Sequence, residues 1–260
     1  MKPYVADDSV VRSIWGKSDT ILFVFAGAAA EFALNKAVDW LYFTGRLPAD
    51  PLGRLFSTVM YARRIVFANE EQALRAIDSI TGIHKAVEKS RGTAIPDWAY
   101  RDVLFMLIHY SIAAYELLER PMTAQEHDDL FDVFFRMGTR MGLKDLPTSY
   151  TAWQTARAEH LQANLAVSKY TTDLFHQYRK HLGSFRYWLL CESQKMVIPA
   201  HVAALLGYKR FSAARPLLFV YKQSRRVRLD SFLKNIILPA KYKKEIADLD
   251  RPPVASESSH

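Results

Sequence analysis

The feature that most constrains this chain is its nearly continuous helical period. Apolar residues recur every three or four positions along most of the sequence, whereas alternating β-branched runs closed by Asn-Gly or Asp-Gly turns are absent. The 10 Gly and 11 Pro among the 260 residues divide this pattern into segments. The sequence therefore predicts an all-α fold, with one helical domain of about ten helices over residues 1–250 and a disordered Pro/Ser-rich tail over 251–260.

Local signals place the helix boundaries. Asp50-Pro51 begins one helix, because a backbone N–H in the first turn has no partner within the helix and proline can therefore do without it. Asn69 is a good N-cap for the next helix. Thr123 and Glu126 form a capping box, and Gly138 and Gly142 mark the end of the helix that follows. The expected helices span about 18–43, 50–68, 70–89, 97–119, 123–140, 148–165, 168–182, 183–192, 199–206 and 212–227, with two short ones after them.

Composition excludes several classes of protein. A chain that is 50% hydrophobic is too apolar to be disordered. The single cysteine, Cys191, can form neither an internal disulfide nor a Cys-rich zinc or iron–sulfur site. The sequence also contains no glycine-rich phosphate loop, no zinc-protease His-Glu-x-x-His motif and no Asp-rich motif of the terpene-cyclase kind.

The positive charge is local. The whole chain carries +8, but the segment Lys209–Lys244 has eleven basic residues against one acid, Asp230, so it accounts for +10. A charged outer face of packed helices is the favoured interpretation of this segment; contact with an anionic membrane or an acidic partner is the alternative, and nucleic acid is not expected.

The N-terminus lacks the apolar core of a signal peptide, and Glu31 interrupts the most apolar run. We therefore expect a cytoplasmic protein, with peripheral membrane contact through Lys209–Lys244 left open.

Two histidines lie within apolar helical patterns. His84 falls on a stripe of positions three or four residues apart, and His109 lies inside the apolar run 103–110. A buried imidazole needs a partner for each ring nitrogen, or a metal on one of them. From the pattern alone, hydrogen-bonded core histidines are favoured and metal ligands are the alternative.

Three further polar residues interrupt apolar segments. Arg54 and Thr58 lie four residues apart and so share one helix face. An inward arginine can hold an anionic group with two parallel hydrogen bonds, and the threonine hydroxyl can bond to a bound oxygen species; capping or pairing with an acid is the plainer role for the arginine. Glu31 is expected at the surface of a packed helix, and if buried it would be a candidate base.

An ordered set of motifs resembles a known family. The motifs are Asp-Pro-Leu-Gly-Arg54-Leu-x-x-Thr58, then Ile83-His84-Lys-Ala-Val87, then Leu107-Ile108-His109 followed by Ala113-Ala114-Tyr115-Glu116. In order and spacing they resemble the family that contains the fungal ER-bound oxygenase of mycophenolic acid biosynthesis (MpaB) and the bacterial latex-clearing rubber oxygenases. The resemblance runs from about Trp15 to Trp153 and continues weakly into the basic C-terminal helices.

This resemblance implies a globin-like all-α fold that binds b-type haem. By position it implies that His84 is the iron ligand, that Arg54 and Thr58 are catalytic and cofactor-binding residues on the distal side, and that His109 belongs to the cofactor pocket. Ser57 matches a position at which some rubber oxygenases carry an iron-ligating lysine, which would leave the sixth iron position open or filled by water.

Two features remain open within the resemblance. The family often has a Gln/His/Pro-containing stretch in its first helix, where this chain has residues 31–35 with the sequence Glu-Phe-Ala-Leu-Asn. Haem propionates need cations, and Arg63, Arg64 and Arg140 are the candidates.

The leading hypothesis is a haem-b-dependent oxygenase that acts with O2 on an apolar, isoprenoid- or lipid-like substrate. The alternative is a non-catalytic helical protein that binds a lipid or a partner without haem, with both histidines as ordinary core residues.

Overall fold

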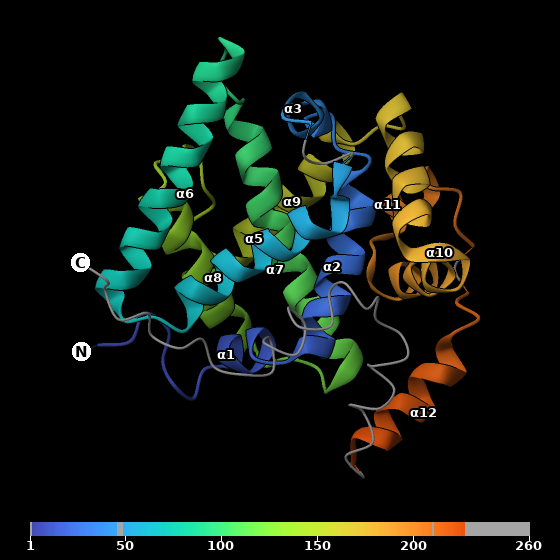
Figure 1. The fold of residues 1–260 in the computed structure, drawn as a ribbon. Helices are drawn as coiled ribbons and strands as arrows, with labels where there is room; N and C mark the ends of the chain where they lie inside the picture. The colour runs from blue at the N-terminus through green and yellow to red at the C-terminus, as the bar shows by residue number, and fades with distance from the viewer. Residues whose placement is uncertain (1, 46–48, 210, 227–260) are drawn as a thin grey trace, which may run out of the picture.

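The computed structural model describes residues 2–45, 49–209 and 211–226, and within these ranges every regular element is a helix (Figure 1). The all-α prediction is confirmed. The helices are α1 (Val10–Trp15), α2 (Ser18–Phe32), α3 (Val38–Phe43), α5 (Pro51–Val66), α6 (Glu70–Arg91), α7 (Asp97–Leu118), α8 (Ala124–Arg140), α9 (Tyr150–Asn164), α10 (Lys169–Val197), α11 (Ala200–Leu205) and α12 (Arg215–Arg226). The short helices expected after residue 227 and the tail 251–260 lie outside the described residues. No helix in the described part of the chain is long and apolar enough to cross a membrane.

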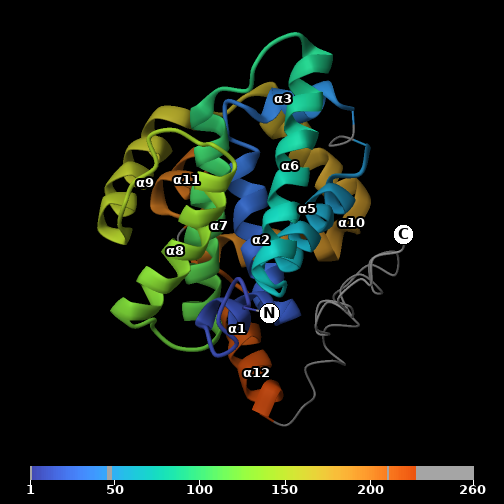
Figure 2. The same cartoon turned by 90° about the vertical axis from the view of Figure 1, so that its left-hand side faces the viewer.

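Helices α2 and α7 form the centre of the bundle. They pack against each other, α10 packs on α2, and α8 and α9 pack on α7. Figure 2 shows α9 and α11 on one side of this central pair and α5 and α10 on the other. Ile21 of α2 and Phe105 and Ile108 of α7 are almost completely buried in the resulting core. Burial of each such side chain contributes about 1.5–3 kcal/mol.

Gly27 lets the two central helices approach closely. A Cβ atom at this position would overlap the ring of Tyr110 on α7. One turn later on the same face of α2, Glu31 accepts a hydrogen bond of 2.7 Å from the Tyr110 hydroxyl. The missing side chain at Gly27 therefore makes room for the tyrosine that reaches Glu31.

We expect Gly27→Ala to lower the free energy of unfolding by about 1–3 kcal/mol, because the buried ring and the backbone must shift to admit the methyl group. Gly82→Ala on α6 is the matched control, since a Cβ there meets nothing within 4 Å. This control should stabilise the protein by up to about 1 kcal/mol, the usual gain of alanine over glycine in a helix. Urea unfolding of both variants measures the difference, and equal effects would contradict the packing described.

The expected helix 18–43 is wrong in one respect, because it is broken between Phe32 and Val38. Asn35 explains the break. Its side-chain oxygen accepts a hydrogen bond of 2.8 Å from the Ala37 amide. The neighbouring backbone pairs instead with the end of α9, where the Ala166 amide donates to the Leu34 carbonyl at 2.8 Å. Helical period alone could not show this distant pairing.

Other boundaries follow the local signals. Asp50 accepts a hydrogen bond from the Gly53 amide, Asn69 accepts one from the Gln72 amide, and the Thr123 capping box is present. The two helices expected on either side of Gly183 are the two halves of α10, which meet at a kink where this glycine has non-helical backbone angles, with φ 73°. Helix α1 was not expected; it is short and almost wholly buried.

Candidate functional site

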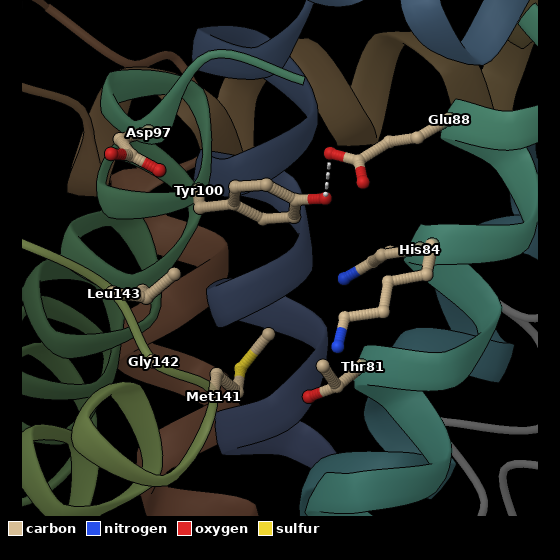
Figure 3. A pocket seen from close by; sticks show the side chains of 9 residues that line it. Thr81, His84, Glu88, Asp97, Tyr100, Met141, Gly142 and Leu143 are labelled. Atoms are coloured by element: carbon tan, nitrogen blue, oxygen red, sulfur yellow. Dashed lines mark hydrogen bonds between the residues drawn. The ribbon is translucent and has the colours of Figure 1, made fainter. Parts of the chain in front are cut away.

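A cavity of about 110 Å³ lies between α6, α7 and the loop that follows α8 (Figure 3). His84 enters it from α6 and faces Tyr100 on α7, with the two ring centroids 5.1 Å apart. Met141 and Leu143 close the opposite side. His84 is half-buried rather than deep in the core, because the C-terminal half of α6 packs on one side only. The predicted inward stripe of α6 thus faces a pocket at this level of the helix.

His84 has a buried ring nitrogen with no hydrogen-bond partner, Nδ1. Its pKa is lowered from the ordinary value of 6.5, mainly by burial and then by the positive charge of Arg54, whereas the nearby Glu88 carboxylate raises it. Glu88 is itself engaged, since it accepts hydrogen bonds from the Tyr100 hydroxyl at 3.1 Å and from the Ile95 amide at 2.8 Å. At neutral pH the imidazole is therefore uncharged and offers a lone pair.

Arg54, Ser57 and Thr58 form one cluster on α5, which packs against α6. The Arg54 guanidinium turns back along its own helix and donates to the Ser57 and Thr58 hydroxyls, both at 3.1 Å. Each hydroxyl donates in turn to the Arg54 carbonyl. The positive charge of Arg54 contributes to the lowered pKa of His84, but Arg54, Ser57 and Thr58 do not line the His84 cavity.

His109 lies in a different environment. Tyr100 and His109 are nine residues apart on α7, which places them on opposite faces of the helix. The His109 and Tyr110 rings lie edge to face, with their centroids 4.9 Å apart. His109 also forms a hydrogen bond with the backbone of Val197 at the end of α10. Its Nε2 is buried without a partner. The structure therefore places His84 at the cavity, Arg54 and Thr58 in a cluster on the neighbouring helix α5, and His109 in a separate environment on the other face of α7.

Glu31 is buried, so the expected surface position is wrong. It is 1% exposed and forms an ion pair with Arg157 of α9, whose two terminal nitrogens lie 2.6 and 2.5 Å from its two oxygens. The Tyr110 hydroxyl donates to the second oxygen. Both carboxylate oxygens are thus bound, and the group joins α2, α7 and α9 instead of facing the His84 cavity.

The chain matches the family model described as ER-bound oxygenase mpaB/B′/rubber oxygenase, catalytic domain, over residues 15–228. It belongs to this oxygenase family. Membership confirms the resemblance drawn from the motifs, suggests that the protein is an enzyme and implies O2 and an organic substrate. No curated protein and no solved structure is similar enough to the chain to count as a match.

The part of the chain that matches the oxygenase family includes a buried network that the motifs did not reveal. Asp102 of α7 lies 2.5 Å from His160 Nδ1 and accepts hydrogen bonds from Asn35 at 2.8 Å and Asn164 at 3.1 Å. A signal was present, because Arg157, His160 and Asn164 follow the buried Trp153 at spacings of four, three and four on α9. This stripe faces the core. Arg157 forms the ion pair with Glu31 of α2, and His160 and Asn164 form hydrogen bonds with Asp102 of α7.

Two of the three arginines proposed for propionates have other partners. Arg63 is 1% exposed and donates to the Trp15 carbonyl. Arg140 forms a two-bond ion pair with Asp78, at 2.8 and 2.6 Å. Arg64 is exposed on α5. Arg140 is also exposed, with its side chain 47% accessible, whereas Arg63 is buried.

A second, larger hollow of about 270 Å³ lies between residues 35–39 and 166–170, and its lining contains no histidine. Within the described ranges, no three His, Cys, Asp or Glu side chains gather closely enough to hold a metal ion by themselves.

Burial of His109 predicts a stability that depends on pH. Burial, and then the charge of Arg157, lowers its pKa from 6.5 to about 3, although the bond to Val197 raises it. The unfolded chain therefore binds a proton that the folded chain does not, so the free energy of unfolding should fall as pH drops from about 6.5 toward 3. The loss between pH 7 and pH 5 should be about 2 kcal/mol for this group. Urea unfolding of His109→Gln at both pH values should show a correspondingly smaller loss; an unchanged loss would contradict the assignment.

Proposed function

We propose that this protein is a haem-b-dependent oxygenase that acts with O2 on an apolar, isoprenoid- or lipid-like substrate, and that His84 is its iron ligand. The observation that carries the proposal is the buried, unpaired Nδ1 of a neutral imidazole that lines a cavity, on a chain that belongs to an oxygenase family. A metal ion satisfies such a nitrogen, and neutral imidazole is a common axial ligand of haem iron.

Two exposed apolar side chains lie on the helices that form the cavity, although the cavity lining itself includes the charged residues Lys85, Glu88 and Asp97. Val103 lies three residues after Tyr100, on the face of α7 that His84 contacts, yet it is 38% exposed. Ile83 on α6 is 43% exposed. Apolar side chains left open beside the unpaired imidazole are suited to cover a porphyrin. Pockets for drug-sized molecules typically measure ~300–1,000 Å³, so the present cavity of about 110 Å³ must widen to admit haem.

Within this proposal the protein residues have separate roles. A bound haem supplies the iron at which O2 is activated. His84 would hold it, and burial, followed by the positive charge of Arg54, keeps His84 in the neutral form that can bind a metal. Arg54 and Thr58 lie on α5 outside the lining of the present cavity, so their guanidinium and hydroxyl would bind a polar oxygen species once the cavity extends to them. Ser57 takes part by holding the Arg54 guanidinium in place.

The test is oxygen uptake by the haemin-loaded protein with squalene as a model polyisoprenoid. Substrate-dependent uptake and a carbonyl or hydroxyl product are expected. Arg54→Ala should lower the rate by about 10²–10³-fold, the usual loss for one electrostatic donor. Arg75→Ala is the control, because Arg75 is an exposed arginine on α6 that pairs with Glu71 and does not line the cavity. Haem-loaded protein without uptake, or equal losses in both variants, would favour the non-catalytic alternative.

A further inference from the structure

Helix α12 is fixed to the bundle by one of its sides. The Tyr221 hydroxyl donates to Asp19 at the start of α2, at 2.9 Å, and the Lys222 ammonium donates to the Leu117 carbonyl at the end of α7, at 3.0 Å. These two residues are adjacent, so they define the side of α12 that faces the core. Figures 1 and 2 both show α12 projecting from one end of the bundle.

The segment that leads into α12 is also held. Glu192 of α10 accepts hydrogen bonds from the Ser212 hydroxyl at 2.9 Å and from the Ala213 amide at 2.6 Å. Both Glu192 and Ser212 are buried. The direction of α12 is therefore set by contacts at its start and in its middle, and its other side has a defined orientation.

The opposite side of this segment is apolar and exposed. Val220 is 57% exposed on the side away from Lys222, whereas Leu217, one turn before Tyr221, lies beside the core-facing side and is 43% exposed. Phe219 is 65% exposed and Phe211, just before the helix, is 68% exposed. These four side chains lie within ten residues of one another, whereas the core-facing positions use a hydroxyl and an ammonium.

Basic residues accompany this apolar face. Lys209 and Arg215 are exposed at its start, and the sequence from Lys209 to Lys244 carries a net +10. A second copy of the chain would bring the same positive charge against it, which disfavours self-association through this face. Exposed Phe, Leu and Val among Lys and Arg suit an anionic lipid surface, where apolar side chains enter the acyl boundary and bases contact the headgroups.

We propose that the exposed side of α12, which carries Phe219 and Val220, with Phe211 before the helix, Leu217 beside this side and Lys209 and Arg215 nearby, is a peripheral docking surface for anionic lipid membranes. This surface would hold the protein at the membrane by the end of the bundle from which α12 projects. The His84 cavity, between α6, α7 and the loop after α8, is not part of this surface.

The test uses the full chain in co-sedimentation with vesicles of phosphatidylcholine, with and without phosphatidylglycerol. Binding is expected on the anionic vesicles, and it should weaken strongly when salt rises from ~0.1 M to ~1 M, as the screening length falls from ~10 Å to ~3 Å. The double variant Phe219→Asp/Val220→Asp should bind roughly tenfold more weakly or worse. Val167→Asp is the matched control, because Val167 is also 58% exposed but lies between α9 and α10.

Several outcomes would overturn the proposal. One is the absence of binding to anionic vesicles; another is equal binding by the double variant and the control. A dimer in solution that the double variant dissociates would assign the face to a second copy. Loss of thermal stability in the double variant alone would assign it to packing against another part of this chain. Haemin binding, measured in parallel, should be unchanged in the double variant, so a failure here is distinguishable from a failure of the proposed oxygenase.

Discussion

His84→Ala is expected to lower the affinity of the protein for haemin by more than about 100-fold. Residues that only support a metal ligand typically contribute 10–100-fold to metal affinity, so loss of the ligand itself should exceed this range. The variant should remain folded, because His84 is half-buried and lines a cavity instead of filling the core. A haemin titration followed in the Soret region, with circular dichroism to confirm folding, measures the effect.

His109→Ala is the informative comparison, since His109 also has a buried, unpaired ring nitrogen but lies in the cluster with Glu31 and Arg157. It should retain haemin binding. Added imidazole should restore part of the spectrum of His84→Ala by occupying the vacated position. If His109→Ala loses haemin and His84→Ala retains it, the ligand assignment is reversed.

Glu31→Ala is expected to lower the free energy of unfolding by about 3–5 kcal/mol. The substitution leaves the Arg157 guanidinium, 5% exposed, as an uncompensated buried charge and removes the acceptor of the Tyr110 hydroxyl. The double variant Glu31→Leu/Arg157→Met should recover much of this loss, because replacing both ions with apolar groups leaves no buried charge. Urea unfolding at pH 7 gives the free energy of unfolding of the wild type, of Glu31→Ala and of the double variant.

The exposed pair Glu71–Arg75 on α6 provides the control for Glu31. Glu71→Ala should cost no more than about 1 kcal/mol, since both side chains are largely in solvent. Similar losses for Glu31→Ala and Glu71→Ala would show that the Glu31–Arg157 pair does not hold α2 and α9 together.

Most helix boundaries could be predicted because their signals are local. Asp50, Asn69 and Thr123 each cap a helix through an amide three residues later, so each signal lies within one short stretch of sequence. Gly183 likewise adopts a positive φ that is costly for other residues, and it marks the kink of α10. Such features need no knowledge of the rest of the fold.

The partners of buried polar residues could not be predicted in this way. Glu31 meets Arg157 across 126 positions of sequence, and Asp102 meets His160 across 58. Helical period shows that a residue faces inward, but it does not show which helix lies opposite. For the same reason the motifs assigned His84 and His109 to one pocket, whereas the folded α7 separates them onto two faces.

The central claim is that one haem binds at His84, and a titration of the purified full-length protein with haemin tests it most directly. Difference absorption should show a single saturable site per chain, with a Soret band distinct from that of free haemin. Because burial and then the charge of Arg54 lower the pKa of His84 from its ordinary value of 6.5, this band should persist at pH 6.5 and weaken only at more acidic pH, where protonation of His84 removes its lone pair. A featureless, non-saturating titration, or a saturable band of equal strength in His84→Ala, would contradict it.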